Sequence, residues 1–438
     1  MENQTSEIIL FSVTSLAKRI ACSPWFPFSV ALLLRLAFLF HQGQRVLPEA
    51  LAVLPFQNEV GSVAAALAHG QGFCCLFQQP TGPTAWLAPV YPFFLSKIFR
   101  VFGTFTITSF YVAAAFNGFF SALACLPLFF AAQRIGNRTM AVVAGWVWAI
   151  FPSGVLIPSE WIWDTSLSAL LASSLLLGTL LLADCPKQPR FVLYGLLSGF
   201  CFLVNPALGA AFPFFLLWLF FRLRAAKTER LTNLALVSVL ALLVCLPWTI
   251  RNAVQFHRLI PIRSDFPFEL WMGNNPIYDE HSREINRITR YEQVRLYAQL
   301  GETRFLDEKG RAAREFIRAH PALCLRLAAN RAVALWLGTS SPWRDFQRAE
   351  SLLVKLLFAW NGLTLLGTMA GLLALLVRGR NYLLPLAAYP VVFPCVYYFT
   401  QASLRLRHPC DPVLALLMAV AMTWPFSKAQ ATVQSLNR

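Results

Sequence analysis

The sequence predicts an all-α fold: a polytopic membrane helix bundle of about ten spans, with interfacial helices in the first outer loop and a small helical outer insertion. Three observations support this fold. Of the 438 residues, 57% are hydrophobic and 13% are charged, whereas soluble domains are about a quarter charged. Uncharged stretches recur at lengths that match a bilayer. Basic residues gather in short loops on one predicted side of these stretches.

Spans are predicted where about 20 apolar residues follow one another, because a helix rises about 1.5 Å per residue. The stretch 191–221 is too long for one span and contains Asn205-Pro206. It is expected to form a helical hairpin, 191–205 and 207–221, that turns at the outer face. Arg35 lies within the first span and must snorkel or face the protein interior. The spans are 24–40, 104–132, 139–157, 165–183, the two arms of the hairpin, 231–250, 351–377, 381–404 and 412–427.

The charge pattern places both termini in the cytoplasm, because short cytoplasmic loops carry an excess of Lys and Arg. Segment 86–102 is apolar but contains Lys97 and Arg100. If this segment crossed the membrane, the later basic loops would lie on the outer side. It is therefore expected to lie as a helix at the outer membrane interface. The sequence thus predicts a multi-pass protein of the cell inner (plasma) membrane. The basic residues of the predicted inner loops and tail are Lys18, Arg19, Arg134, Arg138, Lys187, Arg190, Arg222, Arg224, Lys227, Arg230, Arg378, Arg380 and Lys428.

Three regions follow from these boundaries. Residues 1–250 form an N-terminal membrane bundle with a first outer loop at 41–103, residues 251–350 form an outer (periplasmic) insertion, and residues 351–438 form the C-terminal spans. Within the insertion, charged helices are expected at 281–299 and 303–319, followed by an amphipathic segment at 322–338.

Two predicted outer loops carry carboxylates that could serve in catalysis. Glu59 follows Asn58, a good N-cap, so it lies in the first turn of a helix whose dipole favours the ionised form. Asp164, with Glu160 nearby, begins the span that follows. Each could simply complement a helix end. Alternatively, both could face one cavity, where a carboxylate held ionised accepts a proton or holds a cation.

Basic side chains on the same predicted face could bind a phosphate group. Arg405, Arg407 and His408 stand at the mouth of the last outer loop, against the general charge trend. Guanidinium groups match the geometry of phosphate oxygens. Anchoring at the membrane interface is the alternative interpretation. Arg251 and Arg263, just above the membrane, could add to such a site.

Other chemistries find no support in the sequence. The ten cysteines are scattered, mostly in apolar runs, without the spacing of a zinc or redox site. Neither a P-loop nor a serine-hydrolase motif occurs. The net charge of +16 is explained by the cytoplasmic loops, so the lipid bilayer is an expected partner and nucleic acid is not.

An ordered series of short motifs resembles the glycosyltransferase C superfamily, and within it the bacterial branch of protein O-mannosyltransferases and aminoarabinose transferases. Each motif alone is weak, but their order and their placement on the outer side are fairly specific. The series comprises Glu59 with 67–73, Pro83, 89–92, 151–152, 203–206, 247–248 with 251–252, 273–276, 316–321 and 405–409.

The resemblance implies an outer-face cavity and a reaction. A sugar, hexosyl or pentosyl, passes from a polyprenyl-phosphate donor to a lipid, glycan or protein acceptor, with inversion at the anomeric carbon. Glu59 matches the acidic position that activates the acceptor. Asp164, or less likely Glu160, resembles the second acidic position. Arg405 and Arg407 match the pair that holds the donor phosphate.

Further residues are expected around the same cavity, and two departures from the family pattern bear on it. Asn58 precedes a single acid, Glu59, which leaves the requirement for a divalent cation open. Asn205 stands where many relatives carry Arg. The residues expected to line the cavity are Glu160, Asn205, Asn274, Asn275 and Tyr91.

The main alternative is a transporter or flippase of a lipid-linked sugar. It would explain the spans and the outer Arg cluster. Many transporters, however, consist of two matching halves with broken helices. No such halves occur in this sequence, and an outer insertion of this size is more typical of an enzyme.

Overall fold

The computed structural model describes residues 22–46, 58–77, 79–276, 285–378 and 380–436. Lys18 and Arg19, used above to orient the first span, lie outside these residues. The described chain is helical apart from loops and one isolated bridge between Cys74 and Pro83. The predicted all-α class is therefore confirmed.

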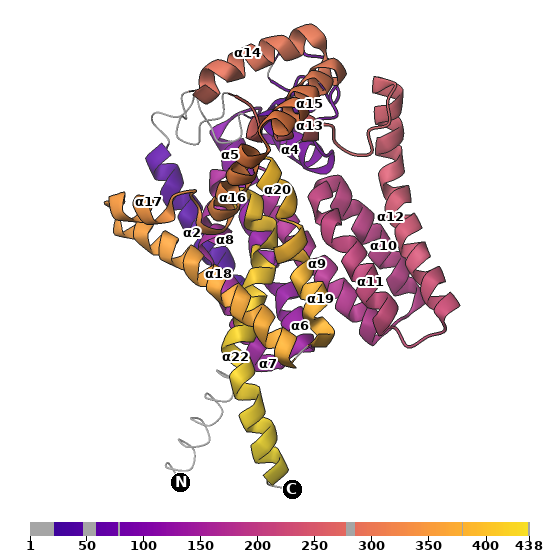
Figure 1. The fold of residues 1–438 in the computed structure, drawn as a ribbon, viewed down its shortest axis with the longest axis vertical. Coiled ribbons are helices and arrows are strands. Elements are labelled where there is room, and N and C mark those ends of the chain that lie inside the picture. The colour runs from indigo at the N-terminus through magenta and orange to yellow at the C-terminus, as the bar shows by residue number, and fades with distance from the viewer. Residues whose placement is uncertain (1–21, 47–57, 78, 277–284, 379, 437–438) are drawn as a thin grey trace.

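Helices of the N-terminal half form the centre of the bundle (Figure 1). Two of the predicted spans are broken helices, because the chain turns at Ala124 and at Ile150–Phe151. The hairpin predicted around Asn205-Pro206 is confirmed, with a short 3-10 helix, η1, at its turn. The elements are α2 (Trp25–Val46), α3 (Glu59–Ala68), α4 (Val90–Phe102), α5 (Ile107–Leu123), α6 (Cys125–Ile135), α7 (Arg138–Ala149), α8 (Pro152–Glu160), α9 (Thr165–Asp184), α10 (Gln188–Val204), η1 (Pro206–Ala211) and α11 (Phe212–Arg222).

Between the two halves of the bundle, the chain forms a helical cap that contains α13, α14 and α15. The helices after this cap return along the bundle. α13, α14 and α15 cover one end of the molecule, and α22 runs to the opposite end (Figure 1). The two charged helices expected in the insertion are confirmed as α14 and α15, except that residues 281–284 lie outside the described part of the chain, and the amphipathic segment 322–338 forms α16. The elements are α12 (Lys227–Phe256), α13 (Phe266–Gly273), α14 (Ile285–Leu300), α15 (Glu302–Ala319), α16 (Pro321–Leu337), α17 (Pro342–Arg348), α18 (Leu352–Arg378), α19 (Arg380–Ala387), the π-helix η2 (Ala388–Val392), α20 (Cys395–Phe399), α21 (Leu404–Arg407), η3 (His408–Cys410) and α22 (Asp411–Leu436).

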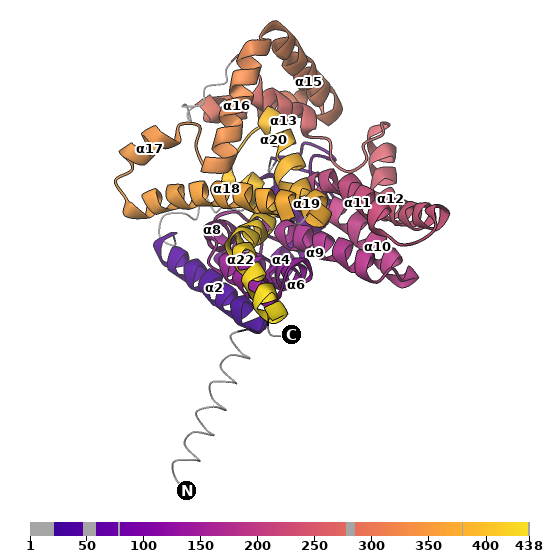
Figure 2. The ribbon, with the colours of Figure 1, turned by 60° about the horizontal axis from the view of Figure 1, so that its bottom comes forward.

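The structure is a polytopic membrane helix bundle. Among the described residues, 7 helical segments are long and apolar enough to cross a membrane. The arms of the hairpin are shorter than these segments. α9 is largely buried, whereas only 28% of the candidate span in α12 and in α18 is buried, and both helices lie at the rim (Figure 2). Such a surface suits lipid, because helices satisfy their own backbone hydrogen bonds there. The segments are Trp25–Gln42, Ile107–Ile135, Arg138–Glu160, Thr165–Asp184, Lys227–Phe256, Leu352–Val377 and Arg380–Phe399.

Arg35 faces the protein interior, which is one of the two outcomes expected for it. Its side chain is 2% exposed. It donates to Ser121 Oγ at 3.0 Å and to the carbonyl of Ala149 at 3.0 Å, and it lies over the Trp148 ring. The Ala149 carbonyl is left without a helical partner where α7 ends, so Arg35 satisfies it and ties α2 to α5 and α7.

One buried carboxylate forms hydrogen bonds to both the first outer loop and the cap. Glu302, at the start of α15, is 5% exposed. Its oxygens accept hydrogen bonds from Thr84 Oγ1 at 2.5 Å, Ala85 N at 2.9 Å, Ser264 Oγ at 2.7 Å and Tyr297 OH at 2.7 Å. One side chain thus joins the first outer loop, the connection into α13, and the cap helices.

Candidate functional site

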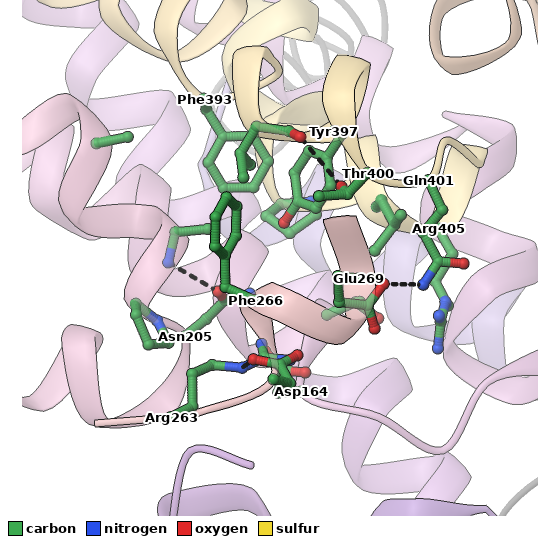
Figure 3. Close-up of a pocket in the computed structure, with 18 of the residues that line it drawn as sticks. Asp164, Asn205, Arg263, Phe266, Glu269, Phe393, Tyr397, Thr400, Gln401 and Arg405 are labelled. Carbon is green, nitrogen blue, oxygen red and sulfur yellow. Dashed lines mark hydrogen bonds and ion pairs between the residues drawn. The ribbon is translucent and has the colours of Figure 1, made fainter. Parts of the chain in front are cut away.

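A cavity of about 350 Å³ opens where the cap meets the helix bundle (Figure 3). The start of α9, the hairpin turn, α13, α20 and α21 contribute its walls. One side is apolar and aromatic, and the other is charged. The lining residues are Trp163, Asp164, Thr165, Asn205, Pro206, Ala207, Ala210, Arg263, Asp265, Phe266, Glu269, Val392, Phe393, Val396, Tyr397, Thr400, Gln401, Arg405, Leu406 and Pro409.

Asp164 lies in the wall of this cavity at the start of α9. Its carbonyl begins the helix by accepting from Ser168 N at 2.8 Å, and its carboxylate accepts from Ser168 Oγ at 3.0 Å. The residue is 8% exposed. Burial raises the pKa of Asp164, while Arg263, Ser168 and Arg405 act in the opposite direction. A buried carboxylate beside two guanidinium groups is typical of a site that handles charge.

Glu59 lies beside the cavity rather than in its wall. Asn58 caps α3, as predicted, by accepting from Val60 N and Gly61 N at 3.1 Å. Glu59 therefore stands in the first turn and is half-buried. Its charge raises the pKa of Glu269 and opposes the fall in the pKa of Arg405, so it is close enough to act on both. A smaller hollow lined by Val60 and Asp164 adjoins the same region.

The connection into α13 brings Arg263, one of the residues expected to bind phosphate, to the cavity together with two acids that the sequence did not point to, Asp265 and Glu269. Arg263 lines both hollows and forms an ion pair with Asp265, with Nε 2.7 Å from Oδ1. Glu269 accepts from Gln401 across the cavity. Burial, with help from Asp265, raises the pKa of Glu269 to about 7. The available signal was an acid inside the otherwise apolar segment 266–273.

Arg405 faces this cavity, but Arg407 and His408 do not line it. Arg407 is 1% exposed; its Nε lies 2.8 Å from Asp411 Oδ1, and its Nη2 lies 3.1 Å from Asn361 Oδ1. His408 is fully buried and stacks on Trp148. Both side chains pack inside the bundle, where they hold the start of α22 against α8 and α18.

Among the other residues expected at the site, Asn205 and Tyr91 line hollows. Asn205 lines the main cavity and accepts from Ala207 N at 3.1 Å. Tyr91 lines the smaller one, and its hydroxyl donates to Asn117 Oδ1 at 2.8 Å. Glu160 ends α8 with an exposed side chain and lines neither.

Arg251 and the two Asn residues after α13 make structural contacts instead. Arg251 donates to the carbonyls of Thr84 at 2.7 Å and Phe73 at 3.1 Å, which holds the first outer loop on α12. Asn274 Nδ2 donates to the Phe399 carbonyl at 2.7 Å, and Asn275 Nδ2 donates to the Trp271 carbonyl at 2.8 Å. These bonds fix the end of α13, and neither Asn lines the main cavity.

The requirement for a divalent cation, left open by the sequence, can be compared with the arrangement of the described acidic, His and Cys side chains. Within the described part of the chain, no group of three or more His, Cys, Asp or Glu residues could hold a metal ion.

Comparison with known proteins supports the fold. No protein-family model and no curated protein matches the sequence. The archaeal oligosaccharyltransferase AglB from Archaeoglobus fulgidus matches in structure: its complex with an inhibitory peptide and a dolichol-phosphate gives a TM-score of 0.55 at 14% identity, covering 94% of this chain and 51% of that one. Its complex with Zn and sulfate gives 0.54 at 14% identity, with the same coverage.

A second enzyme matches less closely. ArnT from Cupriavidus metallidurans bound to undecaprenyl phosphate gives a TM-score of 0.38 at 13% identity, covering 93% of this chain and 79% of that one. The chain spans about half the length of the oligosaccharyltransferase. The resemblance to glycosyltransferase C membrane enzymes is thus confirmed as a structural match at low identity.

Proposed function

We propose that this chain, which has the fold of glycosyltransferase C membrane enzymes, transfers a sugar from a polyprenyl-phosphate donor to a lipid, glycan or protein acceptor. The transfer is hexosyl or pentosyl and inverts the anomeric carbon. One observation supports this most directly: the buried carboxylate of Asp164 shares one cavity with two guanidinium groups, Arg263 and Arg405. The archaeal oligosaccharyltransferase that shares this fold was solved in complex with a dolichol-phosphate.

The donor phosphate is the leaving group, and its growing negative charge needs stabilisation. Arg405 supplies it, because within the described residues its guanidinium forms no hydrogen bond or ion pair. Arg263 adds a second positive charge to the site. This charge is partly offset by the ion pair that Arg263 forms with Asp265. In this proposal Arg405 binds the phosphate directly, and Arg407 and His408 support α21 from inside the bundle.

The acceptor hydroxyl must lose a proton as it attacks, and an inverting displacement places the base opposite the leaving group. We assign this role to Glu59, beside the cavity, and the orientation of donor and acceptor hydroxyls to Asp164. Glu269 can exchange a proton near neutral pH, because burial raises its pKa to about 7.

We further propose the full topology. The hairpin arms and α22 cross the bilayer together with the 7 candidate spans, which gives ten spans. Both termini are then cytoplasmic, and the cavity opens on the outer face of the plasma membrane beneath the cap. The regions 1–250, 251–350 and 351–438 serve as bundle, cap and closing spans. α4 is not among the candidate spans and packs on α3 and α5, as an interfacial helix would.

The assignment of the base can be tested with purified full-length protein in nanodiscs and a panel of polyprenyl-phosphate sugars. Glu59→Gln should lower donor turnover by at least about 100-fold, because general-base catalysis contributes about 10²–10⁴, while undecaprenyl phosphate still binds. Asp164→Asn should weaken turnover as well. Release of free polyprenyl phosphate is the readout.

The outcomes separate the alternatives. Full activity of Glu59→Gln, together with loss of activity in Asp164→Asn, would transfer the role of base to Asp164. Movement of the intact donor across the bilayer, without release of polyprenyl phosphate, would instead identify a flippase. Asp184→Asn, at the far end of α9, is the matched control.

A further inference from the structure

Two tryptophans, rather than a carboxylate, hold Arg405. Its guanidinium carbon lies 4.4 Å from the centre of the Trp161 ring and 4.8 Å from that of Trp163. No ion pair or hydrogen bond joins Arg405 to any other described residue. Stacking on aromatic faces holds a guanidinium group while its in-plane N–H donors stay free for another ligand.

Both rings come from the same short connection as Asp164. Residues 161–164 join the end of α8 to the start of α9, so one segment supplies the two stacking rings and the buried acid. Arg405 enters from α21, far away in the sequence. Trp163 also lines the main cavity, next to Asp164.

Arg405 and Asp164 act on each other without pairing. The charge of each shifts the pKa of the other, yet no ion pair joins these two described side chains, and Figure 3 draws no dashed line between them. The charges of Glu59 and Glu269 also act on Arg405. In a partly desolvated site such neighbours attract strongly, so something must keep the guanidinium away from them.

We propose that Trp161 and Trp163 are positioning residues that hold Arg405 away from the surrounding carboxylates, so that its N–H donors remain available for the phosphate of the lipid donor. This inference rests on the proposed function. Collapse of Arg405 onto Asp164 or Glu269 would occupy the phosphate-binding group and an acid of the site in one step. The two rings prevent this collapse, because they attract the guanidinium group of Arg405 without using any of its N–H donors.

The test measures binding of undecaprenyl phosphate to the full-length protein in nanodiscs. Trp161→Leu and Trp163→Leu should each weaken binding by about 2- to 30-fold, the range that corresponds to loss of one cation–π contact. Trp161→Phe should recover most of the affinity, because a phenyl ring keeps a stacking face. Trp161 is 41% exposed, so its replacement leaves little empty volume in the fold. Trp343→Leu, on the exposed α17, is the matched control and should bind as the wild type does.

A double-mutant cycle distinguishes positioning from general loosening of the site. Arg405→Gln should itself weaken binding, and adding Trp161→Leu to it should cause no further loss. An equal, additive loss in the Arg405→Gln background would overturn the inference, as would unchanged affinity of both Leu variants. If instead Arg405→Gln binds as tightly as the wild type, the proposed donor site itself is wrong. The two failures are therefore distinguishable.

Discussion

Glu269 illustrates how burial prepares a single side chain for proton exchange. It projects from the cap into the cavity and accepts from Gln401. Desolvation disfavours its charged form, and the neighbouring Asp265 adds to the effect, so its pKa rises to about 7. Arg263 only partly offsets these effects. The group therefore changes charge within the physiological range of pH.

Glu269→Gln should change how stability depends on pH. The folded-state pKa lies above the ordinary value of 4.5, so the folded protein binds the extra proton and loses stability as pH rises from about 4.5 to 7. The Gln variant lacks this loss. Allowing for the partial exposure of Glu269, we expect the variant to gain about 1–2 kcal/mol over the wild type between about pH 5 and pH 8.

Thermal unfolding of the wild type and of Glu269→Gln in detergent, at about pH 5 and about pH 8, checks this expectation. Glu308→Gln, at an exposed position on α15, should leave the pH dependence unchanged. A constant difference between wild type and Glu269→Gln across this range would contradict the raised pKa.

Glu302 determines how one element, the cap, sits on the rest of the protein. Its carboxylate accepts hydrogen bonds from three segments: from the first outer loop, from the connection that precedes α13, and from α14. Ser264, one of the donors, is flanked by Arg263 and Asp265, which both line the cavity. Glu302 therefore contributes to coupling the position of the cap to the geometry of the site, together with the Trp86 ring, which packs on Phe268 and Tyr297.

Glu302→Ala should loosen the cap and weaken donor binding together. Its removal leaves buried donors unsatisfied, at a cost of about 1–3 kcal/mol each, and releases the segment that carries Arg263. Hydrogen exchange of residues 79–89 and 260–275 should rise, and the KM for donor should rise more than kcat falls. Glu308→Ala, exposed on the same helix, is the control. Unchanged exchange in these segments would show that other contacts hold the cap.

At the scale of the whole molecule, the cap and the far end of α22 lie at opposite ends of the bundle (Figure 1). The cavity lies under the cap, and the turns between α6 and α7 and between α9 and α10 lie away from it. This polarity agrees with the orientation expected from the basic loops, which remains a prediction about the membrane.

Labelling of intact cells with a membrane-impermeant maleimide tests the orientation. Cys185, exposed between α9 and α10, should stay unlabelled until the cells are opened. A cysteine introduced by Arg311→Cys, at an exposed position on α15, should react at once. Mass spectrometry of the two peptides reads the result, and the reverse pattern would invert the proposed topology.

Much of the fold was predictable because lipid imposes a local rule. Each span must satisfy its own backbone and present apolar side chains, so its position can be read from a window of consecutive residues. The hairpin at Asn205-Pro206 follows from the proline, which is a local signal. The cap helix at 303–319 follows from its charged residues, which are also a local signal. The breaks inside the spans at Ala124 and Ile150 were missed, because buried polar partners such as Arg35 stabilise them from distant segments.

The sequence alone determined the all-α membrane fold, the order of its spans, and the presence of acids and arginines near one face. Only the tertiary structure decided which of these groups meet. Arg405 and Arg407 lie two residues apart on one helix, so they must point in roughly opposite directions. Packing of α21 against α8 and α16 then turns Arg405 to the cavity and Arg407 to the interior. Which of the two arginines faces the cavity therefore depends on contacts between segments far apart in the sequence. The position of Glu269 in the cavity wall depends on such contacts as well, so neither could be predicted from a local sequence pattern.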